Sequence, residues 1–154
     1  MLCSPIKVTP DDVGDHYDEL DEFYRSIWGR NLHHGLWSPG DAPSVRAGTN
    51  RLLSLLLPAL SLKPGIRLVD IGCGYGTDAH RIAEQTGALI AGITISHAQE
   101  KNAREMTPPS QGAVSIKRGD WLQNTYAAQS FDCAIAVESL SHMQDKEGFF
   151  FELH

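Results

Sequence analysis

The sequence predicts an α/β fold in which helices cover a parallel sheet. After residue 63, short apolar runs alternate with segments of helical periodicity, which is typical of such a sheet. The run at 66–71 stops at a glycine-rich loop, as buried parallel strands often do. The chain has 154 residues, 42% hydrophobic and 21% charged, the balance of one globular domain.

The first part of the chain predicts two helices. The stretch 11–28 contains seven of the 19 acidic residues, and the simplest interpretation is a solvated helix face. Four large residues in it fall at helical spacing and predict one buried stripe: Tyr17, Leu20, Tyr24 and Ile27. The stretch 45–60 is strongly apolar and predicts a core helix that ends near Pro58.

The second part predicts alternating strands and helices. The expected strands are 66–71, 88–95, 113–119 and 131–137. The expected helices are 77–86, 96–106 and one that begins at Asp145. Ser96 followed by Gln99 three residues later predicts a capping box at the start of helix 96–106.

Charge and cysteine content exclude several classes of protein. A net charge of −6 argues against general nucleic-acid binding, because a phosphate backbone needs a basic partner surface. We expect no membrane span and no secretory leader, since the chain has neither 18 consecutive apolar residues nor a basic segment followed by an apolar one at its start. Cys3, Cys73 and Cys133 are widely spaced, so no disulfide framework is predicted. The expected setting is therefore the reducing cytoplasm.

The most informative segment is DIGCGYG at 70–76, between an expected strand and an expected helix. Its glycines and the helix N-terminus suit a nucleotide-like cofactor. It is not the dinucleotide motif G-x-G-x-x-G, whose third glycine would fall at Thr77, nor a P-loop, since no Gly-Lys-Ser/Thr follows. Asp70 would repel a phosphate group and attract a cationic amino-acid ligand.

Five segments together resemble class I S-adenosylmethionine-dependent methyltransferases. They are HYDELDEFYRSIWGRNLHHGLW (16–37), IRLVDIGCGYGT (66–77), AGITISHAQ (91–99), GDW (119–121) and FDCAIAVESLSHMQDKEGFF (131–150). They are similar to a subset that includes tocopherol C-methyltransferases, sugar O-methyltransferases, N-methyltransferases that form glycine betaine, and cyclopropane fatty-acid synthases. A glycine-rich loop alone is weak evidence, whereas five segments in the family's order are specific.

The resemblance implies a Rossmann-like, doubly wound parallel sheet with strand order 3-2-1-4 and the family's later strands missing. It implies an N-terminal helical cap at 1–62 and an incomplete cofactor-binding core at 63–154. It further implies methyl transfer from S-adenosylmethionine to the carbon, oxygen or nitrogen of a small-molecule acceptor, with S-adenosylhomocysteine as product.

Residues of the family's cofactor site are carried over by position. They are Tyr17, His33, His34, Asp70, Gly72, Cys73, Gly74, Thr94, Ile95, Gln99, Asp120, Trp121 and Glu138. Thr94 and Gln99 are expected at the ribose, Asp120 at the adenine amino group and Trp121 beside the ring. Asp70 is expected to accept hydrogen bonds from the loop amides or, through water, from the amino group of the cofactor. Each of three residues has a structural alternative: Gln99 as a helix cap, Trp121 as core packing, and Asp70 as a buried capping carboxylate.

Histidines and aromatic residues complete the expected site. His142 is the candidate base, because imidazole accepts a proton near neutral pH; the alternative is a residue that only positions ligands. Tyr24 and Trp37 are expected to line the pocket beside the substrate, since aromatic rings attract a sulfonium. For Tyr24, packing within the cap is the alternative. No metal site is expected, because His33 and His34 have no third ligand at suitable spacing.

Two other functions stay open at this stage. The run 131–137 is apolar on both faces and expects a strand on each side, but no further strand is predicted after it. The chain is then either part of a longer protein, a homo-oligomer, or a catalytically incomplete cofactor-binding half-domain completed by a partner chain. An NAD-dependent oxidoreductase is disfavoured by the missing dinucleotide motif.

Overall fold

A computed structural model describes residues 8–41 and 44–153 of the chain, so Cys3 lies outside the described residues. Its centre is a parallel sheet of β1 (Arg67–Ile71), β2 (Leu89–Thr94), β3 (Ala113–Arg118) and β4 (Cys133–Ile135). The strand order is β3-β2-β1-β4, which confirms the predicted topology.

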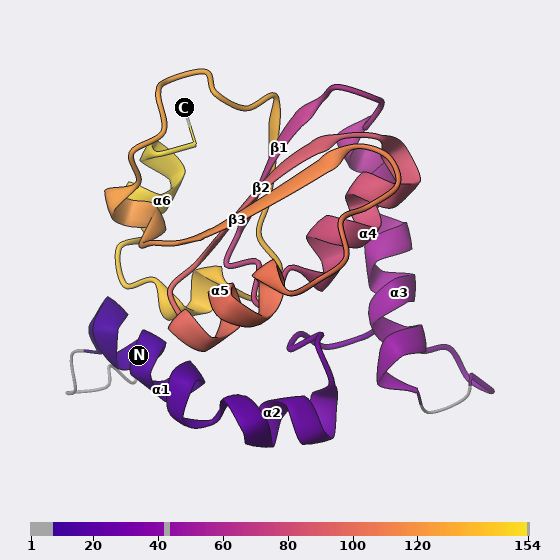
Figure 1. The fold of residues 1–154 in the computed structure, drawn as a ribbon, viewed down its shortest axis with the longest axis horizontal. Helices are drawn as coiled ribbons and strands as arrows, with labels where there is room; N and C mark the ends of the chain where they lie inside the picture. Colours follow the sequence, from indigo (N-terminus) through magenta and orange to yellow (C-terminus); the bar gives the residue numbers. More distant parts are fainter. Residues whose placement is uncertain (1–7, 42–43, 154) are drawn as a thin grey trace.

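The acidic N-terminal stretch forms two helices rather than one. These are α1 (Pro10–Glu19) and α2 (Asp21–Trp28), separated at Leu20, whose ψ of 11° is not helical. The predicted buried stripe is wrong, because Ile27 is 55% exposed. Figure 1 shows both helices running along one end of the sheet rather than packing on its face.

The remaining helices follow the prediction closely. They are α3 (Val45–Leu56), extended by a 3-10 turn η1 (Leu57–Leu60), then α4 (Thr77–Thr86), α5 (His97–Arg104) and α6 (Lys146–Phe151). Two further 3-10 turns are η2 (Trp121–Gln123) and η3 (Leu140–His142). Among the described residues, no helix is both long and apolar enough to cross a membrane.

Each face of the sheet carries its own hydrophobic core, because neighbouring strand residues point to opposite sides. Leu68 and Ile90 face α3 and α4, where they pack with Leu53 and Ile82. The other core lies against η2 and α6, and consists of Val69, Ile71, Ile93, Trp121 and Phe149. The sheet is therefore covered on both sides, as expected for a doubly wound fold.

β4 is shorter than predicted, spanning three residues instead of seven. Leu68 to Asp70 of β1 pair with Cys133 to Ile135 of β4. The chain then turns at Glu138, whose φ of 58° is left-handed, and Ser139 Oγ donates to the Ile71 carbonyl at 2.5 Å. This turn ends β4 early and carries the following residues across the end of β1.

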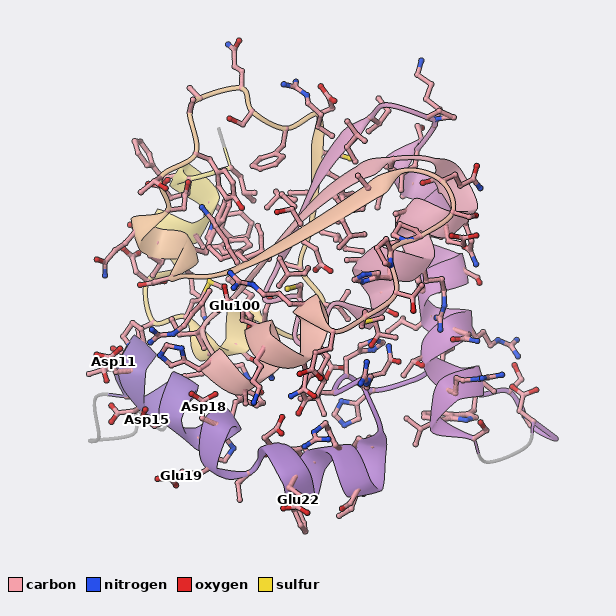
Figure 2. All side chains as sticks on the ribbon, in the orientation of Figure 1. Asp11, Asp15, Asp18, Glu19, Glu22 and Glu100 are labelled. Carbon is pink, nitrogen blue, oxygen red and sulfur yellow. The ribbon has the colours of Figure 1, made fainter. Side chains whose placement is uncertain are left out.

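Helix α1 is attached to the carboxyl end of the sheet through Asp18. Its carboxylate accepts from Ser96 Oγ and from the Ala98 amide at 2.9 Å, at the N-terminus of α5. Figure 2 shows Asp18 between α1 and α5, while Asp15, Glu19 and Glu22 extend outward from the N-terminal helices. These three residues are exposed, so the predicted solvated face is real, but Asp18 does not belong to it.

Candidate functional site

A cavity of about 430 Å³ lies where β1, β2, β3 and β4 end. Helix α1 borders it, as do the loop at 30–33 and the segment 138–145. Open α/β sheets bind ligands at this place, outside the carboxyl ends of the strands. Most of the predicted site residues line it: Tyr17, His33, Asp70, Gly72, Cys73, Gly74, Thr94, Ile95, Gln99, Asp120, Trp121, Glu138 and His142.

Three predicted residues do not line the cavity. His34 Nδ1 lies 2.8 Å from a Glu138 carboxylate oxygen, and its ring is largely exposed. The Tyr24 hydroxyl instead lies 2.9 Å from His16 Nε2. Trp37 also lies outside this lining: its ring fills the space beside Gly48, where an added Cβ would lie 2.4 Å from it.

The three glycines of the loop have three different roles. Gly72 has a φ of 75°, and a Cβ there would lie 2.2 Å from Ser139 Cβ, so it serves packing rather than ligand approach. Gly76 begins α4 and would meet Ile116. Gly74 has a φ of 54°, lines the cavity, and would meet no atom within 4 Å. Only Gly74 therefore matches the expected close approach of a ligand to the backbone.

Asp70 is a buried carboxylate at the end of β1, only 6% exposed. The amides of Gly72 and Cys73 both donate to the Ile93 carbonyl, at 2.8 and 3.0 Å. The expectation that Asp70 accepts from the loop amides is therefore wrong, and within the described chain no group donates to its carboxylate. Burial raises the pKa of Asp70 to about 7; the negative charge of Asp78 acts in the same direction, and His33 opposes it.

The end of β2 presents Thr94 and Gln99 together. Thr94 Oγ1 donates to Gln99 Oε1 at 2.6 Å, and both side chains are buried. Ser96 Oγ caps α5 by accepting from the Gln99 amide at 3.0 Å. The second half of the predicted capping box is absent, because the Ser96 amide faces Thr94 Oγ1 at 3.4 Å instead of the Gln99 side chain. Gln99 is thus directed toward the cavity rather than used as a cap.

At the end of β3, Asp120 and Trp121 have structural partners as well as cavity positions. Asp120 Oδ1 accepts from the Leu122 amide at 3.0 Å and so begins η2. Trp121 is 4% exposed, packs with Phe149, and donates through Nε1 to the Phe149 carbonyl at 3.4 Å. The core-packing alternative for Trp121 is therefore confirmed, and its ring edges the cavity at the same time.

His142 lies against Tyr17 in the lining of the cavity. Its Nε2 lies 3.1 Å from the Tyr17 hydroxyl, and the two rings meet edge to face. Burial lowers the pKa of His142, and the nearby His16 and Lys146 act in the same direction. Burial also raises the pKa of Tyr17, so its phenol stays protonated. A neutral imidazole at neutral pH is able to accept a proton from a ligand.

The sequence did not point to the network that fixes His33. His33 Nε2 lies 2.7 Å from Asp78 Oδ2, His33 Nδ1 lies 2.8 Å from the His34 carbonyl, and Asn31 donates to Asp78 Oδ1 at 2.9 Å. Burial opposes protonation, but the hydrogen bond to Asp78 outweighs it and raises the pKa of His33. Asp78 at one ring nitrogen and the His34 carbonyl at the other fix the orientation of the His33 ring. The sequence signal that could have indicated this network is Asp78, an acidic residue in the first turn of the helix after the glycine loop.

The mycolic acid cyclopropane synthetase family matches residues 6–153 of this chain. The chain belongs to that family. The chain is 37% identical over 142 residues to the 27-O-demethylrifamycin SV methyltransferase of Amycolatopsis mediterranei, a match that covers 91% of this chain and 52% of that enzyme. It is 32% identical to the (+)-O-methylkolavelool synthase of Herpetosiphon aurantiacus, a match that covers 94% of this chain and 52% of that enzyme. The chain thus spans about half the length of these relatives.

Solved structures agree with the family fold. The [4+2]-cyclase SpnF has a TM-score of 0.85 and 30% identity, with 94% of this chain and 55% of that chain covered. Mycolic acid cyclopropane synthase CmaA1 has a TM-score of 0.72 at 22% identity. The match covers 86% of this chain and 47% of that chain, and it supports the fold. This fold is shared by proteins named as methyltransferases, as a cyclase and as a cyclopropane synthase. The fold alone therefore does not identify the reaction, which has to be inferred from the residues of the site.

In this member of the cyclopropane synthetase family, the cavity wall is acidic. Its described carboxylates are Asp70, Asp78, Asp120, Glu138 and Asp145, whereas Arg30 is the one Lys or Arg in the same described lining. Such a wall favours a cationic ligand over one that carries a diphosphate, such as NAD. In the described part of the chain, no group of three His, Cys, Asp or Glu side chains is placed to hold a metal ion.

Proposed function

We propose that this chain binds S-adenosylmethionine and transfers its methyl group to a small-molecule acceptor, releasing S-adenosylhomocysteine. The observation that carries this proposal is the buried Asp70 carboxylate, which lines the cavity together with Gly74. A buried carboxylate without a hydrogen-bond donor is stabilised by a cationic ligand, and S-adenosylmethionine carries an ammonium and a sulfonium. The acidic wall of the cavity supports the same ligand.

The remaining walls fit the other parts of this cofactor. The pair Thr94 and Gln99 suits the ribose hydroxyls, since the Gln99 amide nitrogen donates to no described residue. The edge of Trp121 suits the adenine ring, with Asp120 as acceptor for its amino group. His33 and Glu138 line the end near Asp70, where the amino-acid part is expected. The bound cofactor supplies an electrophilic methyl group on sulfur.

The protein's own contribution to the reaction is positioning and proton transfer. A cavity bordered by α1 would hold donor and acceptor in line, which lowers the barrier without further chemistry. His142 is the base that takes a proton from the acceptor, and Tyr17 fixes the orientation of its ring. The acceptor is a small molecule, and we place the protein in the cytoplasm. We assign 1–62 to the cap and 63–154 to the cofactor-binding core.

Gly74→Val tests the proposal. The branched side chain would enter the cavity and strain a residue whose φ is 54°, so affinity for S-adenosylhomocysteine should fall at least about tenfold. Gly29→Val is the matched control, because Gly29 has a φ of 71°, no neighbour within 4 Å, and lies outside the cavity lining. Calorimetry with S-adenosylmethionine, S-adenosylhomocysteine and NAD measures all three affinities. Normal affinity in Gly74→Val, or preference for NAD, would refute the assignment.

A second function is favoured by the sheet edge. Among the described strands, β4 pairs only with β1, so the sheet is open on its other side. A cofactor-binding half-domain that needs a partner chain would leave this edge free in the same way. A methyl-transfer assay of the 154-residue chain separates the two functions: cofactor binding without turnover supports the half-domain.

A further inference from the structure

Three side chains that follow Gly74 bond the segment 21–33, which contains α2 and the loop after it. They belong to Tyr75, Thr77 and Asp78, and their partners are Asp21, the Arg30 carbonyl and Asn31, at 2.6, 2.7 and 2.9 Å. All three residues belong to the cavity lining. The glycine loop and the start of α4 are therefore attached to the segment 21–33 at the wall of the cavity.

The contact between Tyr75 and Asp21 reaches a residue outside the cavity. Asp21 is not part of the described lining, and its side chain is 14% exposed. Tyr75 is 1% exposed, and burial raises its pKa, with the neighbouring Asp21 carboxylate acting in the same direction. The phenol therefore stays protonated and donates a short, charge-assisted hydrogen bond to the carboxylate.

The backbone on both sides of Tyr75 has few restraints of its own. Gly74 and Gly76 have φ values of 54° and 73°, and glycine loses more conformational freedom on ordering than any other residue. A ligand that approaches the backbone at Gly74 needs this loop in one conformation. The buried ring of Tyr75 and its bond to Asp21 supply a fixed point between the two glycines.

Asp21 is itself held in place. It begins α2, where a negative charge is favourable. Arg25, one turn later, donates from Nε to Asp21 Oδ2 at 2.9 Å, while Oδ1 accepts from Tyr75. Because each carboxylate oxygen has its own partner, the position of α2 determines where the Tyr75 hydroxyl is held.

We propose that Asp21 is a positioning residue of the cofactor site, which acts through Tyr75 to hold the backbone at Gly74 in its binding conformation. This inference rests on the proposed function and adds to it a residue outside the cavity. The coupling is reciprocal, so a ligand bound at Gly74 also orders α2.

Two variants remove this bond from either side. Tyr75→Phe keeps the ring and loses the hydroxyl, and Asp21→Ala loses the acceptor. Each should weaken binding of S-adenosylhomocysteine about fivefold in calorimetry, because ordering the loop then uses part of the binding energy. The double variant should bind no more weakly than either single variant, since both changes remove the same bond.

Tyr126→Phe and Glu22→Ala are the matched controls. Tyr126 is another half-buried tyrosine, and Glu22 is the neighbouring carboxylate in the first turn of α2, which extends outward in Figure 2. Neither belongs to the cavity lining. Both variants should keep the affinity of the parent chain.

Hydrogen exchange separates positioning from a general loss of stability. In the parent chain, S-adenosylhomocysteine should slow exchange of the α2 amides as well as those of residues 93–95 in the cavity lining. In Tyr75→Phe the ligand should still slow exchange at 93–95 but no longer in α2. A purely structural bond would leave the effect of the ligand on α2 unchanged.

The outcomes distinguish this inference from the proposed function. No binding of S-adenosylhomocysteine by the parent chain would refute the cofactor assignment and this inference with it. Binding by the parent, with the same affinity in Tyr75→Phe and Asp21→Ala or with losses that add in the double variant, would overturn only the positioning role. Circular dichroism shows whether each variant is folded, and if Tyr75→Phe is not, Asp21→Ala against Glu22→Ala decides.

Discussion

Asp70 connects ligand binding to pH at the level of a single residue. Its pKa rises from an ordinary carboxyl value to about 7 in the folded chain. Between these values the folded state binds the proton and the unfolded state does not, so Asp70 lowers stability as pH rises, by up to about 1.4 kcal/mol per pH unit. A cationic ligand removes this cost, so its affinity should increase toward neutral pH.

Asp70→Asn should therefore stabilise the free protein at about pH 8 and have little effect at about pH 4. Urea unfolding of parent and variant across this range measures the difference. The variant should at the same time lose affinity for S-adenosylhomocysteine, because the amide cannot pair with an ammonium. Asp11→Asn, at an exposed position of α1, controls for the general effect of removing a carboxylate. If the free energy of unfolding of parent and variant had the same pH dependence, Asp70 would not have a raised pKa in the folded chain.

Gln99→Ala separates ligand binding from helix capping. The Ser96 cap accepts from the backbone amide of residue 99, so it persists in the variant. We expect a modest loss of stability from the missing Thr94 contact and about a tenfold loss of cofactor affinity. Asn102→Ala, on the same helix but outside the cavity lining, is the control. Lower melting temperature with unchanged affinity would leave Gln99 a structural role only.

At the scale of elements, the sequence was most informative where boundaries are set locally. Helix α4 has its predicted bounds because left-handed glycines, Gly76 and Gly87, flank it on both sides. The break at Leu20 has no local cause. It accompanies long-range contacts on either side, from Asp18 to α5 and from Tyr75 Oη to Asp21 at 2.6 Å.

In the site, too, features set by local sequence were predicted and features set by long-range contacts were not. The glycine loop and the residues that follow β2 and β3 were identified from local motifs, and the structure brings them to one cavity. The free carboxylate of Asp70 depends on loop amides that donate to Ile93, in a different strand. The position of Trp37 depends on its contact with Gly48. Neither contact has a sequence pattern, because both are set by tertiary packing.

The attachment of α1 to α5 is a testable property of these two elements. Asp18 accepts from Ser96 Oγ and from the amides of His97 and Ala98, at an N-terminus where negative charge is favourable. Asp18→Asn should cost about 1 kcal/mol at neutral pH. Burial opposes ionisation, but these bonds lower the pKa of Asp18, so the loss should vanish as pH falls below that of an ordinary carboxyl.

Hydrogen exchange reports where that stability is lost. In Asp18→Asn, amides of α1 should exchange faster, while those of β1 and β2 should keep the parent rates. Asp15→Asn, one turn earlier and exposed, is the control and should change neither region. Unchanged exchange in α1 would show that Asp18 does not hold the helix over the cavity.

At the scale of the whole molecule, the sheet has an open edge beside β4. In the described part of the chain, β4 has a partner on one side only. The chain also exposes apolar surface at α6 and just after it, with Phe151 79% and Leu153 38% exposed. Unpaired edges and exposed apolar patches favour association with further polypeptide.

We therefore predict that the 154-residue species associates with a second copy or another polypeptide rather than remaining an isolated monomer. Light scattering combined with intact mass measures this directly. Phe151→Lys should shift the population toward the monomer, because it places a charge on the exposed patch, while Phe23→Lys, at a 57% exposed position of α2, should not. A monodisperse parent of 16.9 kDa with full methyl-transfer activity would show that the edge of β4 needs no partner.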